Sequence, residues 1–88
     1  KTIRMVHTIG KNIQKVKEDF ILNLKLLRAS KDLSGKELAE KTGMAIKRIA
    51  DLEEGRVNPT LVDLVSISTF FNISYDDLLA KKAKVTFQ

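Results

Sequence analysis

The sequence has no cysteine and no tryptophan, and only one histidine and one proline among its 88 residues. Without thiols, disulfide bonds and cysteine nucleophiles are excluded, and His7 alone cannot supply the ligand set of a structural zinc or haem site. No apolar run exceeds three residues, so there is neither a membrane-spanning stretch nor the apolar centre of a signal peptide. These absences predict a cytoplasmic protein that holds no metal or cofactor and does not enter a membrane.

The features of an enzyme active site are also missing. A domain of this length buries only about 60–65% of the surface of its unfolded chain, which favours a compact binding module over an elaborate cleft. The four glycines are isolated, so there is no glycine-rich phosphate loop. His7 stands near the end of the chain, where an activated serine–histidine–aspartate set is not expected. The sequence therefore predicts no catalytic residue and no enzyme.

The positive charge is concentrated at the two ends of the chain. Sixteen Lys and Arg against eleven Asp and Glu give a net charge of +5. Residues 1–17 contain five basic and no acidic residues, residues 18–80 contain eight basic and eleven acidic residues, and residues 81–88 add three lysines. Each basic end is either a solvated tail or an arm that follows DNA, and the net charge alone does not identify the protein.

Apolar residues recur with helical spacing near the N-terminus. Steps of 4, 3, 4, 4 and 3 place six of them on one face: Ile9, Ile13, Val16, Phe20, Leu24 and Leu27. We expect a helix from about Gly10 to Lys31, or two helices separated near Glu18–Asp19. Either this face packs on the core of its own domain, or its first turns overhang the domain and pack on a second copy.

Three helix-start patterns divide the rest of the chain. A Ser or Thr precedes an acidic residue by three positions at Ser34–Glu37, Thr60–Asp63 and Ser74–Asp77, which is a capping-box spacing. Gly43 and Gly55 are suited to end helices. We expect short helices over about 35–42 and 46–54, two more after Thr60 and Ser74, and no strand. The helix after Thr60 is predicted to bury Leu61, Leu64, Val65, Ile67 and Phe71, and to expose Ser66, Ser68 and Thr69.

The second and third of these helices have helix-turn-helix spacing. A steep crossing at short range needs a small residue, which Ala39 supplies, and the tight turn needs the glycine at position 43. Ile49 is placed to anchor the second helix of the pair, with Leu52 three residues later. Each feature is common alone, but together they indicate this motif.

Three segments resemble the phage-repressor-like (Xre/Cro-type, lambda-repressor-like) helix-turn-helix family. They are LSGKELAEKTG at 33–43, IADLEEGRVNPTL at 49–61 and FFNISYDDLL at 70–79. The resemblance implies an all-α, compact five-helix domain over residues 19–80. A basic N-terminal extension or helix overhang at 1–18 would precede it, and a basic tail at 81–88 would follow.

The resemblance also implies a sequence-specific DNA-binding transcriptional regulator. In the family the third helix enters the major groove, and its base-reading positions match Ile46, Lys47 and Asp51, which would address a thymine methyl, a guanine edge and a cytosine amine respectively. The phosphate-contacting positions match Gly35, Lys36, Arg48, Arg56 and Asn58. The implied partner is double-stranded DNA with a pseudo-palindromic operator, bound by a homodimer that represses by occluding polymerase.

Some residues depart from the family pattern. Gly35 and Ile46 stand where the family often has glutamine, and Glu54 stands where it usually has a neutral or basic residue. These departures keep a second function open, namely a protein-binding or antitoxin-type module on the same fold, with the face of Ile9, Ile13 and Val16 as the partner surface. The family pattern further implies a structural ion pair between Arg28 and Glu53.

Overall fold

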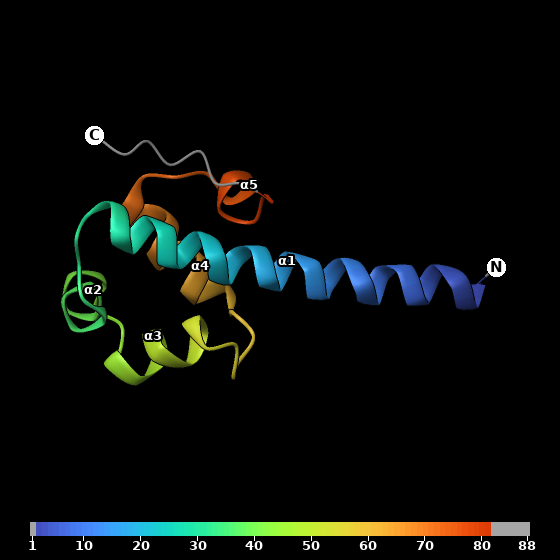
Figure 1. Cartoon of the computed structure of the whole chain (residues 1–88), viewed down its shortest axis with the longest axis horizontal. Helices are drawn as coiled ribbons and strands as arrows, with labels where there is room; N and C mark the ends of the chain where they lie inside the picture. Colours follow the sequence, from blue (N-terminus) through green and yellow to red (C-terminus); the bar gives the residue numbers. More distant parts are fainter. Residues whose placement is uncertain (1, 82–88) are drawn as a thin grey trace.

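The structure is a computed structural model that describes the backbone of residues 2–81 and the side chains of residues 12–81. It contains five helices, α1 (Thr2–Ser30), α2 (Gly35–Thr42), α3 (Ile46–Glu53), α4 (Leu61–Phe71) and α5 (Tyr75–Leu78) (Figure 1). No strand occurs between residues 2 and 81, and the predicted all-α class is confirmed. Apart from Lys81, the expected C-terminal tail lies outside the described residues.

α1 is a single helix of 29 residues. It begins at Thr2 rather than near Gly10, and the alternative break near Glu18–Asp19 is wrong. Both acids support the helix, since Gln14 Nε2 donates to Glu18 at 3.2 Å and Lys15 pairs with Asp19 at 3.5 Å, each four residues apart. α1 crosses the domain boundary expected after residue 18 and extends well beyond the other four helices (Figure 1). No helix within residues 2–81 combines the length and apolarity needed to cross a membrane.

The predicted helix starts are formed by side-chain caps. Ser34 Oγ accepts from Glu37 N–H at 3.1 Å, and the Glu37 carboxylate accepts from Ser34 N–H at 2.9 Å. Thr60 and Asp63 make the same reciprocal pair at the start of α4. At α5 only half of the box is seen, where Ser74 Oγ accepts from Asp77 N–H at 3.1 Å. Each cap satisfies backbone donors that the first helical turn leaves unpaired.

All five helices contribute to one small core. Its fully or nearly buried apolar residues are Phe20, Leu24, Leu27, Leu38, Ala39, Ile49, Leu52, Ile67 and Leu78. Asn23, which the sequence did not single out, is completely buried, and its Nδ2 donates to the carbonyls of Leu78 at 2.7 Å and Ala80 at 2.8 Å. It thereby ties the middle of α1 to the end of α5. This core fixes α2 and α3 against α1 and so sets the frame of the helix-turn-helix.

The predicted core face of α4 is partly wrong. Leu61 is 74% exposed and Val65 is 42% exposed, whereas Ser68, predicted to face solvent, is 7% exposed. The buried face follows positions 64, 67, 68 and 71, which is the spacing of one helical stripe. Ser68 is tolerated there because its hydroxyl donates to the Val65 carbonyl at 3.2 Å.

Candidate nucleic-acid interface

The turn between α2 and α3 is built from local hydrogen bonds. Gly43 adopts a left-handed conformation with φ of 76°, which a residue with a side chain rarely takes. Thr42 Oγ1 donates to the Leu38 carbonyl at 2.7 Å and accepts from Met44 N–H at 3.3 Å. The chain therefore leaves α2 in a defined direction and enters α3 two residues after Met44.

α3 is anchored on one side and open on the other. Ile49 and Leu52 are 1% exposed and hold the inner face in the core. The first turn points outward, where Ile46 is 53% exposed and the Lys47 side chain is 83% exposed. Two of the three expected base readers therefore lie on the free surface of a helix whose inner face cannot shift without disturbing the core.

Asp51, the third expected base reader, is not a free acceptor. It is 8% exposed, and its carboxylate receives Lys47 Nζ at 2.7 Å and Arg56 Nη1 at 2.8 Å. These hydrogen bonds, first that from Lys47 and then that from Arg56, hold the pKa of Asp51 below its ordinary value. Asp51 thus joins one expected base reader to one expected phosphate contact.

Arg48 is held against the start of α4. Its Nε and Nη2 both donate to the Asp63 carboxylate, and Nη2 also donates to the Asn58 carbonyl at 3.3 Å. Burial, the largest single influence, raises the pKa of Asp63, but the hydrogen bonds from Arg48 and Thr60 together outweigh it and leave that pKa lowered. The sequence marked Asp63 only as a helix cap. Its second role was missed because it depends on how α3 meets α4.

The remaining expected phosphate contacts lie at the edges of the same surface. Gly35 begins α2, where a Cβ would meet Ile49 Cγ2 at 4.0 Å, an ordinary contact. Lys36 follows it and is exposed, and no ion pair of Lys36 is found in the described structure. Arg56 also pairs with Glu54 at 2.8 Å. Asn58 turns its carbonyl to Arg48 at 3.3 Å and its side chain toward α1.

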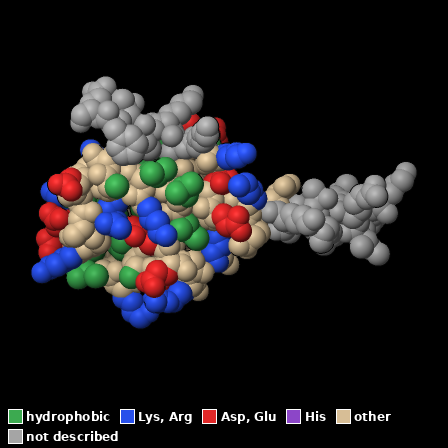
Figure 2. All heavy atoms as spheres, in the orientation of Figure 1, with side chains coloured by type: hydrophobic (Ala, Val, Ile, Leu, Met, Phe, Trp, Pro, Cys, Tyr) green, Lys and Arg blue, Asp and Glu red, His purple; other side chains and the backbone are tan. Residues whose placement is uncertain are grey.

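Positive and negative side chains alternate on the protein surface. In the face shown in Figure 2, Lys and Arg are interspersed with Asp and Glu, and no broad field of one sign forms. Around α3 the cause is the pairing of Lys47, Arg48 and Arg56 with acidic neighbours. DNA phosphates would have to compete with these carboxylates for the cations. Breaking an exposed ion pair costs little free energy.

A second ion pair lies behind this surface. Arg28 on α1 donates from Nε and Nη2 to the two Glu53 oxygens at 2.7 and 2.9 Å, and from Nη1 to the Leu33 carbonyl at 2.9 Å. The hydrogen bond to Glu53 raises the pKa of Arg28, although burial opposes the shift. This bidentate geometry joins α1, the loop before α2, and the end of α3.

Comparison with known proteins gives the family. A family model described as helix-turn-helix matches residues 24–78, more than half of the chain. The HTH-type transcriptional activator BcrR of Enterococcus faecalis is 32% identical over 68 residues, which cover 77% of this chain and 33% of that protein. The HTH-type transcriptional regulator DdrOP3 of Deinococcus deserti is 36% identical over 56 residues, which cover 64% of this chain and 43% of that protein.

The matched segments therefore span less than half the length of either regulator. No solved structure matches the chain. The family match contains the α2–α3 pair, the left-handed Gly43 and the capped start of α4 described above. The chain belongs to the phage-repressor-like (Xre/lambda-repressor-like) helix-turn-helix family.

Proposed function

We propose that this protein is a sequence-specific DNA-binding regulator of transcription, with the first turn of α3 in the major groove. The observation that carries the proposal is the outward position of Ile46 and Lys47 on a helix whose inner face is locked in the core. Lys47 donates to the O6 and N7 atoms of a guanine, and Ile46 packs on a thymine methyl. Asp51 accepts from a cytosine amine once Lys47 or Arg56 turns to the DNA.

The surrounding residues position the protein on the phosphate backbone. Lys36, Arg48 and Arg56 supply charge, Asn58 a polar side chain, and Gly35 a backbone N–H at the start of α2. Two copies bind a pseudo-palindromic operator whose half-sites lie about one helical turn apart. Repression by occluding polymerase needs only that the operator is occupied, and we place this activity in the cytoplasm.

Salt dependence tests the proposal. Three cationic phosphate contacts per copy give a slope of log K against log salt of about −3 per copy and about −5 per dimer. The intramolecular ion pairs of Arg48 and Arg56 make the measured slope shallower than this limit. Fluorescence anisotropy of labelled duplexes between about 0.05 and 0.2 M salt is expected to show a clear loss of affinity as the salt concentration rises. Lys47→Ala is expected to weaken the sequence preference. No binding at the lower salt concentration would contradict the proposal.

A second candidate function is a protein-binding or antitoxin-type module. It is favoured by the acidic partners of the three cations around α3 and by the absence of glutamine at positions 35 and 46. An apolar contact with a protein would be insensitive to salt, so the same titration separates the two functions. Salt-insensitive capture of a protein partner, with no DNA bound, would favour this module.

A further inference from the structure

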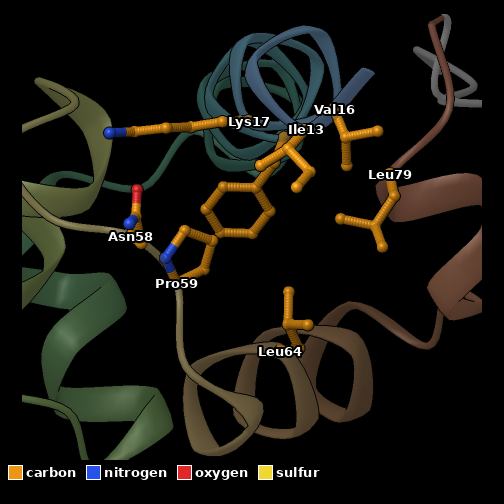
Figure 3. A pocket seen from close by; sticks show the side chains of 8 residues that line it. Ile13, Val16, Lys17, Asn58, Pro59, Leu64 and Leu79 are labelled. Carbon is orange, nitrogen blue, oxygen red and sulfur yellow. The ribbon is translucent and has the colours of Figure 1, made fainter. Parts of the chain in front are cut away.

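An apolar groove opens where α1 leaves the domain. It encloses about 250 Å³, and Figure 3 shows Ile13 and Val16 of α1 above it, Pro59 and Leu64 on the opposite side, and Leu79 at its end. Ile13 is 65% exposed and Val16 is 40% exposed, although both continue the stripe that Phe20 carries into the core. The core-facing stripe of α1 therefore extends past the edge of its own domain.

The sequence continues this stripe to the start of α1 with coiled-coil spacing. Alternating steps of 4 and 3 connect positions 2, 6, 9, 13, 16 and 20, the inner positions of a heptad, and four of these residues are Val or Ile. The flanking heptad positions before Val16 hold Ile3, Met5, Gly10 and Asn12, none of which is charged. The basic residues of this stretch, Lys1, Arg4, Lys11 and Lys15, all fall at outer positions. Up to Val16, a second copy of this helix can therefore approach without charges at the flanking positions. Beyond Val16, Lys17, which lines the groove, and Asp19 hold flanking positions and carry opposite charges.

We propose that a second copy of this chain covers this face, with the two α1 helices packed antiparallel. In that orientation Ile9 of one copy lies opposite Ile13 of the other, and Val6 lies opposite Val16, so the stripe is complementary to itself. Gly10 and Asn12 lie nearest the two-fold axis. The first turn of each α1 reaches the groove of the second copy. A parallel pair is disfavoured because the rest of each domain packs on this same face of α1, and the two domains would then occupy the same space.

The length of α1 supports a second copy as the occupant. Its N-terminal part extends beyond the other four helices (Figure 1), and its first core residue is Phe20, eighteen residues after the helix begins at Thr2. A helix of this length is marginal in water without packing, so a partner helix explains why the stripe continues. Leu24 is the middle one of the three core residues of α1 and marks the position of each domain along the helix. Antiparallel pairing about residue 11 separates the two Leu24 residues by about 39 Å along α1, at 1.5 Å per residue. That distance is of the order of the 34–36 Å between half-sites, but the pairing itself does not rest on DNA binding.

Sedimentation equilibrium of the whole chain tests whether two copies pair through this face of α1. The wild type is expected at about twice the chain mass of 9.9 kDa, and Ile13→Glu at the mass of one chain. Leu22→Glu is the matched control, because Leu22 is 49% exposed on the opposite side of the same helix, and it should remain a dimer. Far-UV circular dichroism and melting of each variant show that the domain is folded, and Ile13→Ser replaces Ile13→Glu if the latter unfolds.

The orientation of the helices is tested separately. Because the chain has no cysteine, Lys25→Cys gives a single spin-label site at an exposed position of α1. Antiparallel pairing predicts a distance of about 42 Å between the two labels along the helix axis, whereas parallel pairing brings them close together. A monomeric wild type, a dimer that survives Ile13→Glu or Ile13→Ser, or a short label distance would overturn the proposal. A folded monomer that still binds DNA would overturn it while leaving the proposed function intact.

Discussion

The Arg28–Glu53 pair is expected to stabilise the fold rather than select the DNA sequence. The Arg28 side chain is 28% exposed and that of Glu53 is 12% exposed, and two hydrogen bonds join them. Removing one partner of a buried pair costs about 3–5 kcal/mol, and partial exposure of Arg28 reduces this to about 2–3 kcal/mol for Arg28→Ala. For a domain of this size, that loss lowers the melting temperature by about 10–20 °C.

Urea unfolding and thermal melting measure this loss directly. Lys25→Ala, an exposed lysine of the same helix, is the control and should remain within about 0.5 kcal/mol of the wild type. Arg28→Met combined with Glu53→Leu removes both charges and should recover much of the stability lost in Arg28→Ala. The DNA base preference of folded Arg28→Ala should be the same as that of the wild type. An Arg28→Ala protein that melts like the wild type but has lost DNA binding would refute this reasoning.

Two further predictions concern the carboxylates around α3. Asp51→Asn removes the negative charge shared by Lys47 and Arg56 and leaves one neutral acceptor oxygen in its place. Binding to a duplex of random sequence should therefore become several-fold tighter and more salt-dependent in an anisotropy titration. Unchanged affinity would mean that the two cations were already available. The pKa of Asp63 is lowered in the fold, so its contribution to stability is present above the ordinary carboxyl pKa of about 3.9 and is lost as the pH falls further. Asp63→Asn should therefore be less stable than the wild type in urea unfolding at neutral pH, and it should lose less stability than the wild type on acidification. Parallel stability–pH profiles of the two proteins would contradict a stabilising role of the Asp63 carboxylate.

Local signals in the sequence predicted much of the fold. The reciprocal caps at Ser34 and Thr60 and the left-handed turn at Gly43 depend on residues within a few positions of one another. The buried face of α2 and α3 followed from the spacing of Leu38, Ala39, Ile49 and Leu52 for the same reason.

The parts that the sequence did not predict depend on packing between distant segments. The rotation of α4 buries Ser68 and exposes Val65, and periodicity could not choose between these neighbouring faces of an apolar helix. Arg48, in the first turn of α3, meets Asp63 fifteen residues away, because the chain after α3 returns and brings the start of α4 within reach of the Arg48 side chain. The pairing of Arg56 with Asp51 likewise appears only when the loop after α3 folds back. The Lys47–Asp51 pair, by contrast, has the four-residue spacing of neighbours on one helix face, a local signal that the sequence analysis missed. These contacts decide how much charge the candidate interface offers to DNA.

Selection of random duplex DNA by the folded protein at moderate salt, followed by sequencing, is the most direct test of the central claim that α3 reads DNA sequence. The account predicts enrichment of a two-fold-symmetric motif with half-sites about one helical turn apart. Lys47→Ala should lose the preference at one base pair of each half-site, whereas Lys25→Ala should select the same motif as the wild type. Failure of the folded wild type to enrich any sequence would contradict the account.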